Sequence, residues 1–279
     1  MFRKISITPL FTLLCLLISI SGYSRQKPLP ENNIFYYPDS SATTDPYIKS
    51  QCRLDIYYPK NAKNFATVVW FHGGGITGGR KEIPKELTDK GIAVIGVGYR
   101  LSPKAKAPAY IEDAAAAVAW VFKHIETYGG NKNLIIVSGH SAGGYLGLMI
   151  TLDKSYLNKY NIDANAIAGL VPFSGQCITH YTIRQENGIR DTQPIIDKYA
   201  PLFHARMETP PILLITGDRE MELLGRYEEN AYLLRVMKLN GNKVTRLFEL
   251  DGYDHGGMAV PAFPLLLKEI DRLKKLAKL

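Results

Sequence analysis

The chain has 279 residues, of which 46% are hydrophobic and 22% charged, with a formal net charge of +8. This composition is that of a folded globular protein and excludes a disordered tail. The length suits one large α/β domain and leaves no room for a second. Much of the positive charge lies in the last stretch, residues 268–278, as one face of a helix. This charge is not accompanied by a motif that recognises nucleic-acid bases or by aromatic residues that stack on them, so we expect no nucleic-acid binding.

The N-terminus has the pattern of a secretory signal peptide over residues 1–24. Arg3 and Lys4 precede an apolar run over 5–20, and small residues follow at 21–24. We therefore expect export to the periplasm or the outside, without stable membrane insertion after cleavage. An uncleaved anchor and a lipid anchor at Cys15 are the alternatives. The run is shorter than the roughly 20 residues of a spanning helix, and a leucine precedes Cys15 where lipidation sites have a small residue.

Strand-like and helix-like stretches alternate after a lead segment, residues 25–50, and throughout the expected catalytic domain, residues 51–279. This order predicts an α/β-hydrolase fold, with a mostly parallel central sheet flanked by helices. The expected strands are Arg53–Tyr58, Ala66–Phe71, Ile92–Val97, Leu134–Ser138, Ile167–Phe173, Ile212–Thr216 and Val244–Leu250. The expected helices are Lys81–Lys90, Pro108–Tyr128, Ala142–Leu152, Tyr227–Asn240 and Pro264–Leu279.

Residues 175–205 interrupt this alternation, because they follow neither the strand nor the helix period. We expect a short cap-like insertion over the carboxyl ends of the strands, where ligands bind in open α/β sheets. A disordered loop is the alternative, but apolar residues such as Tyr181 and Ile183 argue against it. Cys177 lies in this stretch, and whether it pairs with Cys52 stays open.

The strongest functional motif is Gly139-His-Ser141-Ala-Gly143-Gly, between a buried strand and a helix. At such a turn a serine is held in a strained conformation that exposes its hydroxyl, and the glycines avoid collisions across the turn. Ser141 is therefore the expected nucleophile. The next residue, Ala142, begins the helix. The N-terminal N–H groups and the dipole of this helix stabilise negative charge beside the serine.

A serine hydroxyl needs a base, and the base needs an orienting acid. His255 follows the last strand in a loop that this topology places beside the nucleophile, so we expect it to be the base. Asp218 ends the buried strand between the serine and the histidine and is the first choice for the acid. The rival acids are Glu220, Glu222 and Asp254.

Acyl transfer also needs preorganised donors for the oxyanion. His72-Gly73-Gly74-Gly75 follows a strand, and successive glycines let backbone N–H groups approach an oxygen closely. We expect Gly74, Gly75 and the Ala142 amide to form this oxyanion hole. A phosphate loop is not expected, because no Gly-Lys-Ser/Thr follows.

Together these motifs resemble the α/β-hydrolase superfamily and, within it, carboxylesterases and acetyl esterases of the hormone-sensitive-lipase-like and bacterial feruloyl/acetyl esterase types. The resemblance also includes Tyr99-Arg100-Leu101-Ser-Pro, and it implies that Arg100, with Asp113, is scaffold. It further implies hydrolysis of short acyl esters without a metal or cofactor. The sequence departs at Ile76, where many relatives carry an aromatic residue, so the acyl preference stays open.

The expected function is that of a serine esterase acting on a small ester, with an acylated oligosaccharide as one candidate substrate. The oligomeric state stays open. An amide hydrolase of the formamidase or peptidase type is the first alternative, and a binding module that has lost catalysis is the second. The large extra domain typical of such peptidases is not expected here, and every residue type that the triad needs is present.

Overall fold

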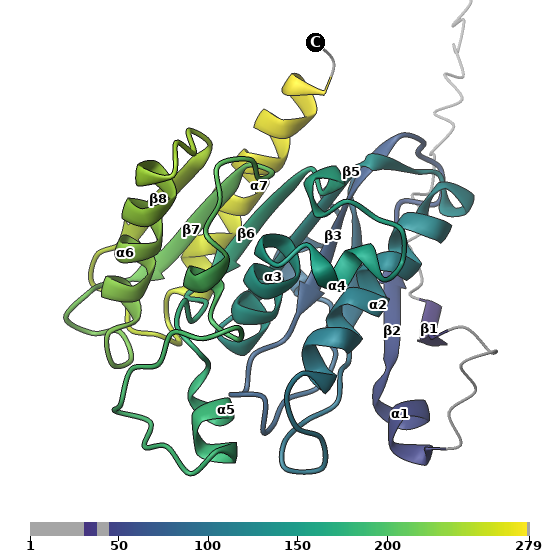
Figure 1. The fold of residues 1–279 in the computed structure, drawn as a ribbon. Helices are drawn as coiled ribbons and strands as arrows, with labels where there is room; N and C mark the ends of the chain where they lie inside the picture. Colours follow the sequence, from purple (N-terminus) through teal and green to yellow (C-terminus); the bar gives the residue numbers. More distant parts are fainter. Residues whose placement is uncertain (1–30, 38–44, 278–279) are drawn as a thin grey trace, which may run out of the picture.

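The computed structural model describes residues 31–37 and 45–277. Its centre is a sheet of eight strands in the order β1-β2-β4-β3-β5-β6-β7-β8 (Figure 1). The pairs β1–β2 and β2–β4 are antiparallel, and the remaining pairs are parallel. The strands are β1 Glu31–Phe35, β2 Arg53–Tyr57, β3 Phe65–Phe71, β4 Ala93–Val97, β5 Gly130–His140, β6 Gly169–Phe173, β7 Ile212–Gly217 and β8 Thr245–Leu250.

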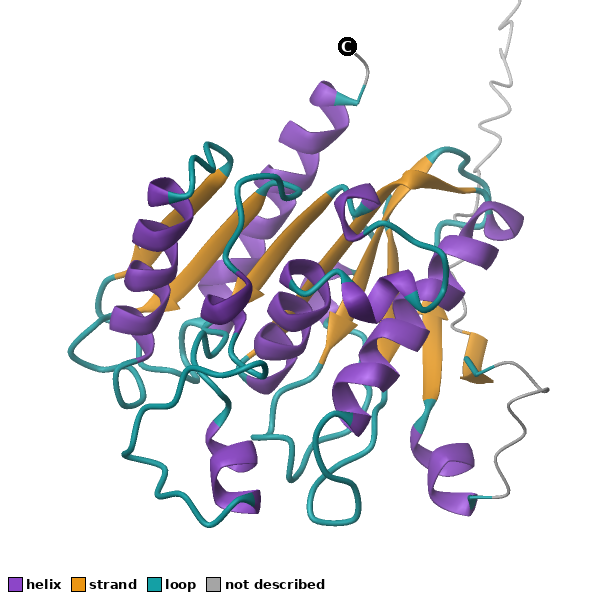
Figure 2. Cartoon of the chain, in the orientation of Figure 1, coloured by secondary structure: helices purple, strands orange, loops and turns teal. Residues whose placement is uncertain are grey.

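Helices cover both faces of the sheet, as Figure 2 shows. The α-helices are α1 Pro46–Gln51, α2 Ala109–His124, α3 Ala142–Leu152, α4 Ser155–Asn158, α5 Tyr181–Glu186, α6 Arg226–Leu239 and α7 Ala259–Leu276. Short 3-10 turns lie at η2 Lys85–Leu87, η3 Ile125–Tyr128, η4 Ala164–Ala166 and η5 Pro201–His204. The predicted α/β-hydrolase architecture is confirmed.

Alternation along the strands divides the core into two layers, because successive side chains point to opposite faces. Val69 and Val137 pack in the layer that includes residues of α2, α3 and α6. Val68 and Ile136, their neighbours along β3 and β5, pack in the layer with Phe263 and other residues of α7. Strands β3, β4, β6 and β7 are buried on both faces and therefore read as continuous apolar runs.

Three expectations need correction. The helix expected over 81–90 is only the single turn η2, in a segment that Pro84 opens and Gly91, at φ +68°, closes. The last helix begins at Ala259, before Pro264, which the helix accommodates in its second turn. The lead segment holds β1 and α1, an edge strand and a helix that the sequence pattern did not reveal.

Cys52 and Cys177 are both buried and free, so the structure contains no bridge between them. The expected signal peptide, residues 1–24, lies outside the described residues. No helix within the described ranges is long and apolar enough to cross a membrane.

Candidate active site

Ser141 lies at the sharp turn between β5 and α3, in the strained conformation that the motif predicts. Its backbone has φ 55° and ψ −114°, and its N–H donates to the Phe173 carbonyl over 2.8 Å. The flanking glycines are sterically required: a Cβ on Gly143 would lie 2.0 Å from the Phe71 carbonyl oxygen, and one on Gly139 would lie 2.7 Å from the Gly143 backbone. The strand, turn and helix thus present the serine hydroxyl at the carboxyl edge of the sheet.

His255 reaches this hydroxyl from the loop after β8, as predicted. Its Nε2 lies 2.9 Å from the Ser141 Oγ, and its side chain is 16% exposed. This distance allows the imidazole to take the serine proton directly.

The acid that contacts His255 is Glu222, so the choice of Asp218 was wrong and one of its rivals takes the position. The Glu222 Oε2 lies 2.7 Å from the His255 Nδ1. Asp218 instead accepts the backbone N–H groups of Gly252, over 2.8 Å, and Glu220, over 2.9 Å. These amide hydrogen bonds lower the pKa of Asp218.

The local backbone explains this exchange of roles. Asp218 opens a tight turn in which its carbonyl accepts the N–H of Glu222 over 2.8 Å. The turn brings Glu222 back to the end of β7, where its Oε1 accepts the N–H of Gly217 over 2.8 Å. The longer glutamate side chain then reaches the histidine, and it is only 1% exposed.

Burial alone would raise the pKa of Glu222, but hydrogen bonds outweigh it. Contacts with His255, Ser174 and the Gly217 amide lower that pKa to about 2. Glu222 is therefore a carboxylate at every pH where the imidazole can act as a base. An ionised acid at Nδ1 holds the proton of the ring there and leaves Nε2 free to accept.

Ser174 is a member of the site that the sequence did not reveal. It follows β6 in the left-handed region at φ 49°, and its Oγ lies 2.9 Å from the His255 Nδ1. Its hydroxyl also contacts Glu222, so it lies beside the acid–base pair and touches both partners. A non-glycine residue with this φ directly after a strand is the feature that singles it out, and it is not visible in the sequence.

His140, next to the nucleophile, supports the loop that carries the base. Its Nε2 lies 2.8 Å from the His255 carbonyl oxygen, so this nitrogen carries the proton and donates. Burial, with a further contribution from His255, lowers the pKa of His140 to about 4. A neutral His140 therefore fixes the backbone of His255 without adding charge to the site.

The expected oxyanion hole lies where the two motifs meet. Gly74 and Gly75 have φ angles of +107° and +64°, and in the described part of the chain neither amide N–H has a protein acceptor. The Ala142 amide is at the first position of α3, where backbone N–H groups have no partner within the helix. A Cβ on Gly73 would lie 3.6 Å from the Ser141 Cβ, so the glycine loop runs beside the nucleophile.

Tyr99 braces this loop, and the next residue, Arg100, ties the segment after β4 to α2. The Tyr99 hydroxyl donates to the His72 carbonyl over 2.7 Å, and its ring stacks on the His72 ring at 4.3 Å. Arg100 forms an ion pair with Asp113 at 2.7 Å, and the Asp113 side chain is fully buried. This pair joins the loop after β4 to α2, which agrees with the scaffold role that the resemblance implies.

The insertion after β6 lies at the carboxyl end of the strands and covers the glycine loop (Figure 1). Its helix α5 contacts Gly75 directly: the Thr182 Oγ1 donates to the Gly75 carbonyl over 2.5 Å. The Glu186 Oε2, at the other end of α5, accepts the Ala107 N–H over 3.1 Å. These two hydrogen bonds attach α5 to the glycine loop and to the segment before α2.

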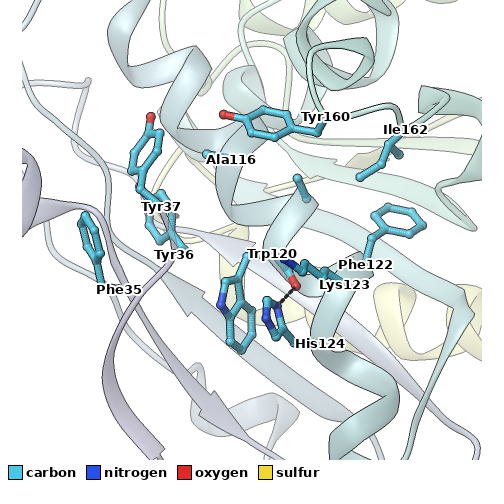
Figure 3. A pocket seen from close by; sticks show the side chains of 11 residues that line it. Phe35, Tyr36, Tyr37, Ala116, Trp120, Phe122, Lys123, His124, Tyr160 and Ile162 are labelled. Atoms are coloured by element: carbon cyan, nitrogen blue, oxygen red, sulfur yellow. Dashed lines mark hydrogen bonds between the residues drawn. The ribbon is translucent and has the colours of Figure 1, made fainter. Parts of the chain in front are cut away.

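A separate hollow of about 630 Å³ lies between β1, the residues that follow it and the second half of α2 (Figure 3). Aromatic side chains dominate its lining, among them Tyr37, Trp120 and Tyr160. It shares no residue with the Ser141 site. Among the described residues, no cluster of three or more histidine, cysteine or acidic side chains could hold a metal ion.

Comparison with known proteins places this geometry in context. The family model BD-FAE matches residues 54–226. Esterase LipC from Mycobacterium tuberculosis is 25% identical over 238 residues, which cover 73% of this chain and 57% of LipC. The probable isoprenylcysteine alpha-carbonyl methylesterase ICMEL1 from Oryza sativa subsp. japonica is 28% identical, covering 80% of this chain and 59% of that protein. The chain thus spans less than two thirds of the length of these curated relatives.

Solved structures show the same fold. A truncated carbohydrate esterase from gut microbiota superposes with a TM-score of 0.71 at 18% identity, covering 90% of this chain and 98% of that chain. Esterase B from Lactobacillus rhamnosis gives a TM-score of 0.71 at 18% identity, covering 91% and 88%. With the family match over more than half of its length, the chain belongs to the BD-FAE family and has the α/β-hydrolase fold.

Proposed function

We propose that the protein is a serine esterase that cleaves short-chain carboxylic esters. The observation that carries this proposal is the continuous hydrogen-bonded chain from the Ser141 Oγ through the His255 ring to the Glu222 carboxylate, at 2.9 and 2.7 Å. Nucleophile, base and orienting acid need this order and these distances. The relatives named as esterases support the same chemistry.

The reaction follows from the geometry in two halves. The Ser141 Oγ attacks the ester carbonyl carbon while His255 Nε2 takes the hydroxyl proton, and the resulting oxyanion accepts from the amides of Gly74, Gly75 and Ala142. His255 then gives the proton to the leaving alcohol oxygen as the C–O bond breaks, which leaves an acyl group on Ser141. Water repeats the sequence, with His255 as base, and releases the carboxylic acid.

The substrate class is part of the proposal. We expect an acetyl or feruloyl ester of a carbohydrate, a choice supported by the gut-microbiota carbohydrate esterase among the structural neighbours. Helix α5 lies against the glycine loop and limits the space beside it, which within this class favours the acetyl group over the bulkier feruloyl group. Export, from the pattern over residues 1–24, would bring the enzyme to such substrates outside the cell.

The test compares hydrolysis of p-nitrophenyl acetate by the protein and by its Ser141→Ala variant, with Ser155→Ala as matched control, because Ser155 is an exposed serine at the start of α4. We expect turnover that falls by roughly 10⁵-fold or more in Ser141→Ala and is unchanged in Ser155→Ala. Equal background rates in all three proteins would contradict the esterase. Acetylated and feruloylated oligosaccharides, compared with octanoyl esters, then test the substrate class.

A further inference from the structure

Tyr181 lies against the oxyanion loop at the start of α5. A Cβ built on Gly75 would lie only 1.9 Å from the Tyr181 Oη and 3.0 Å from its Cζ. Since a Cα–Cβ bond is about 1.5 Å long, the hydroxyl is within about 3.4 Å of the Gly75 Cα. An oxygen that accepts the Gly75 amide lies about 2.9 Å from that nitrogen. The hydroxyl and an oxyanion bound to the Gly75 amide would thus both lie beside Gly75.

The hydroxyl is available to a ligand. Tyr181 is partly exposed, and no other group in the described ranges forms a hydrogen bond with its Oη. Other tyrosines around this site do have protein acceptors: the Tyr99 hydroxyl donates to the His72 carbonyl, and the Tyr145 hydroxyl donates to the Tyr199 carbonyl over 2.8 Å. The Tyr181 donor therefore remains for the substrate.

The side chain is also fixed in place. Its ring stacks on the His180 ring at 4.5 Å, and its backbone N–H donates to the Gln176 Oε1 over 3.1 Å. The next residue, Thr182, donates to the Gly75 carbonyl. A donor held in this way needs little reorganisation when charge develops nearby, which is the condition for effective oxyanion stabilisation.

We infer that Tyr181 is a further catalytic residue, whose hydroxyl donates a hydrogen bond to the oxyanion together with the backbone amides. The inference rests on the proposed esterase function. It gives the insertion a chemical role, because the insertion supplies a donor that the glycine loop lacks. Tyr181 contributes mainly in the transition state, where the carbonyl oxygen carries negative charge.

The experiment measures Tyr181→Phe, which keeps the ring and its stacking, beside Tyr232→Phe as control. Tyr232 is 56% exposed and lies on α6. The first readout is the affinity for phenylboronic acid, measured by calorimetry. Boron adds the Ser141 Oγ, the serine proton passes to His255, and the boron becomes a tetrahedral anion that mimics the intermediate. Boron NMR checks that geometry. The second readout is kcat and KM with p-nitrophenyl acetate.

We expect Tyr181→Phe to weaken boronate binding about 10-fold and to lower kcat by a similar factor, with KM within about twofold, as for loss of one partly exposed neutral donor. Thermal unfolding should match the parent protein. Values within twofold of Tyr232→Phe in both readouts would overturn the inference, and so would a change in KM alone.

The boronate measurement also separates this inference from the proposed function. A parent protein that binds the boronate at Ser141 but hydrolyses no ester contradicts the esterase, while the comparison of boronate affinities still decides the role of Tyr181. A parent protein that neither hydrolyses esters nor forms the adduct contradicts both.

Discussion

Replacement of Glu222 by glutamine tests the identity of the orienting acid most directly. The Glu222 carboxylate lies 2.7 Å from the His255 Nδ1 and its side chain is 1% exposed, so no water can take its place. The amide of Glu222→Gln fills the same volume but removes the charge and can present an N–H to the ring. That contact favours the tautomer with its proton on Nε2, which cannot accept from Ser141.

We expect kcat for p-nitrophenyl acetate to fall about 10⁴-fold in Glu222→Gln, the loss seen when the acid of a serine triad becomes an amide. Asp218→Asn should retain kcat within about threefold, because the Asp218 carboxylate accepts the backbone amides of Gly252 and Glu220 and forms no hydrogen bond with His255 among the described residues. Glu220→Gln, whose side chain is 86% exposed, is the control for a charge lost from the same loop.

The kinetics should be measured at several pH values. Because the pKa of Glu222 is lowered to about 2, the acid stays ionised in any practical assay. Glu222→Gln should therefore lower the rate at every pH of the profile, because the parent protein keeps this carboxylate ionised throughout. Full activity in Glu222→Gln together with a large loss in Asp218→Asn would refute the assignment.

Three further variants probe the surroundings of the triad. Ser174→Ala should lower kcat about 10-fold, because the hydroxyl that contacts both the acid and the base is lost; an unchanged kcat would contradict this role. Gly75→Ala should abolish most activity, since its Cβ would meet the Tyr181 hydroxyl at 1.9 Å and its φ is +64°, and activity like that of the parent would show that the loop can shift. His140→Gln keeps a donor but does not titrate. The folded state lowers the pKa of His140 to about 4, so the unfolded chain binds more protons between about pH 6.5 and 4, and stability is lost as pH falls through this window. Denaturant titrations should show this pH slope reduced by up to about 1.4 kcal/mol per pH unit in the variant, and an identical slope would contradict it.

Much of the fold could be predicted from the sequence because its signals are local. The buried strands read as apolar runs, and the expected helix over Ala142–Leu152 has the observed bounds. The helix expected over 81–90 does not form, because Pro84 and Gly91 bound its helix-forming residues and the chain closes only one turn. Strand β1 has no recognisable strand pattern in the sequence, because a five-residue strand at the edge of the sheet pairs with β2 alone.

In the candidate site, too, the residues defined by local motifs could be predicted, and the residues placed by tertiary contacts could not. Ser141 and the glycine loop are defined by short motifs whose steric reasons are local, so both could be located, and His255 followed from the order of elements. The acid could not be assigned, because Asp218 and Glu222 follow the same strand and only the turn between them decides which one faces the histidine. Ser174 lies directly after β6 and Tyr181 lies in the segment without periodicity, and tertiary contacts decide the position of both.

The attachment of α5 to Gly75 and to the start of α2 has a consequence for how the enzyme would meet lipid-like substrates. An insertion that shares a hydrogen bond with the glycine loop cannot swing away without moving the amides that we propose as oxyanion donors. Such an enzyme should show no interfacial activation: its rate on tributyrin should saturate smoothly, without a jump at the solubility limit. A sudden rise at the appearance of emulsion droplets would mean that these hydrogen bonds break during turnover. If the rate does saturate smoothly, the protein acts on esters one dissolved molecule at a time.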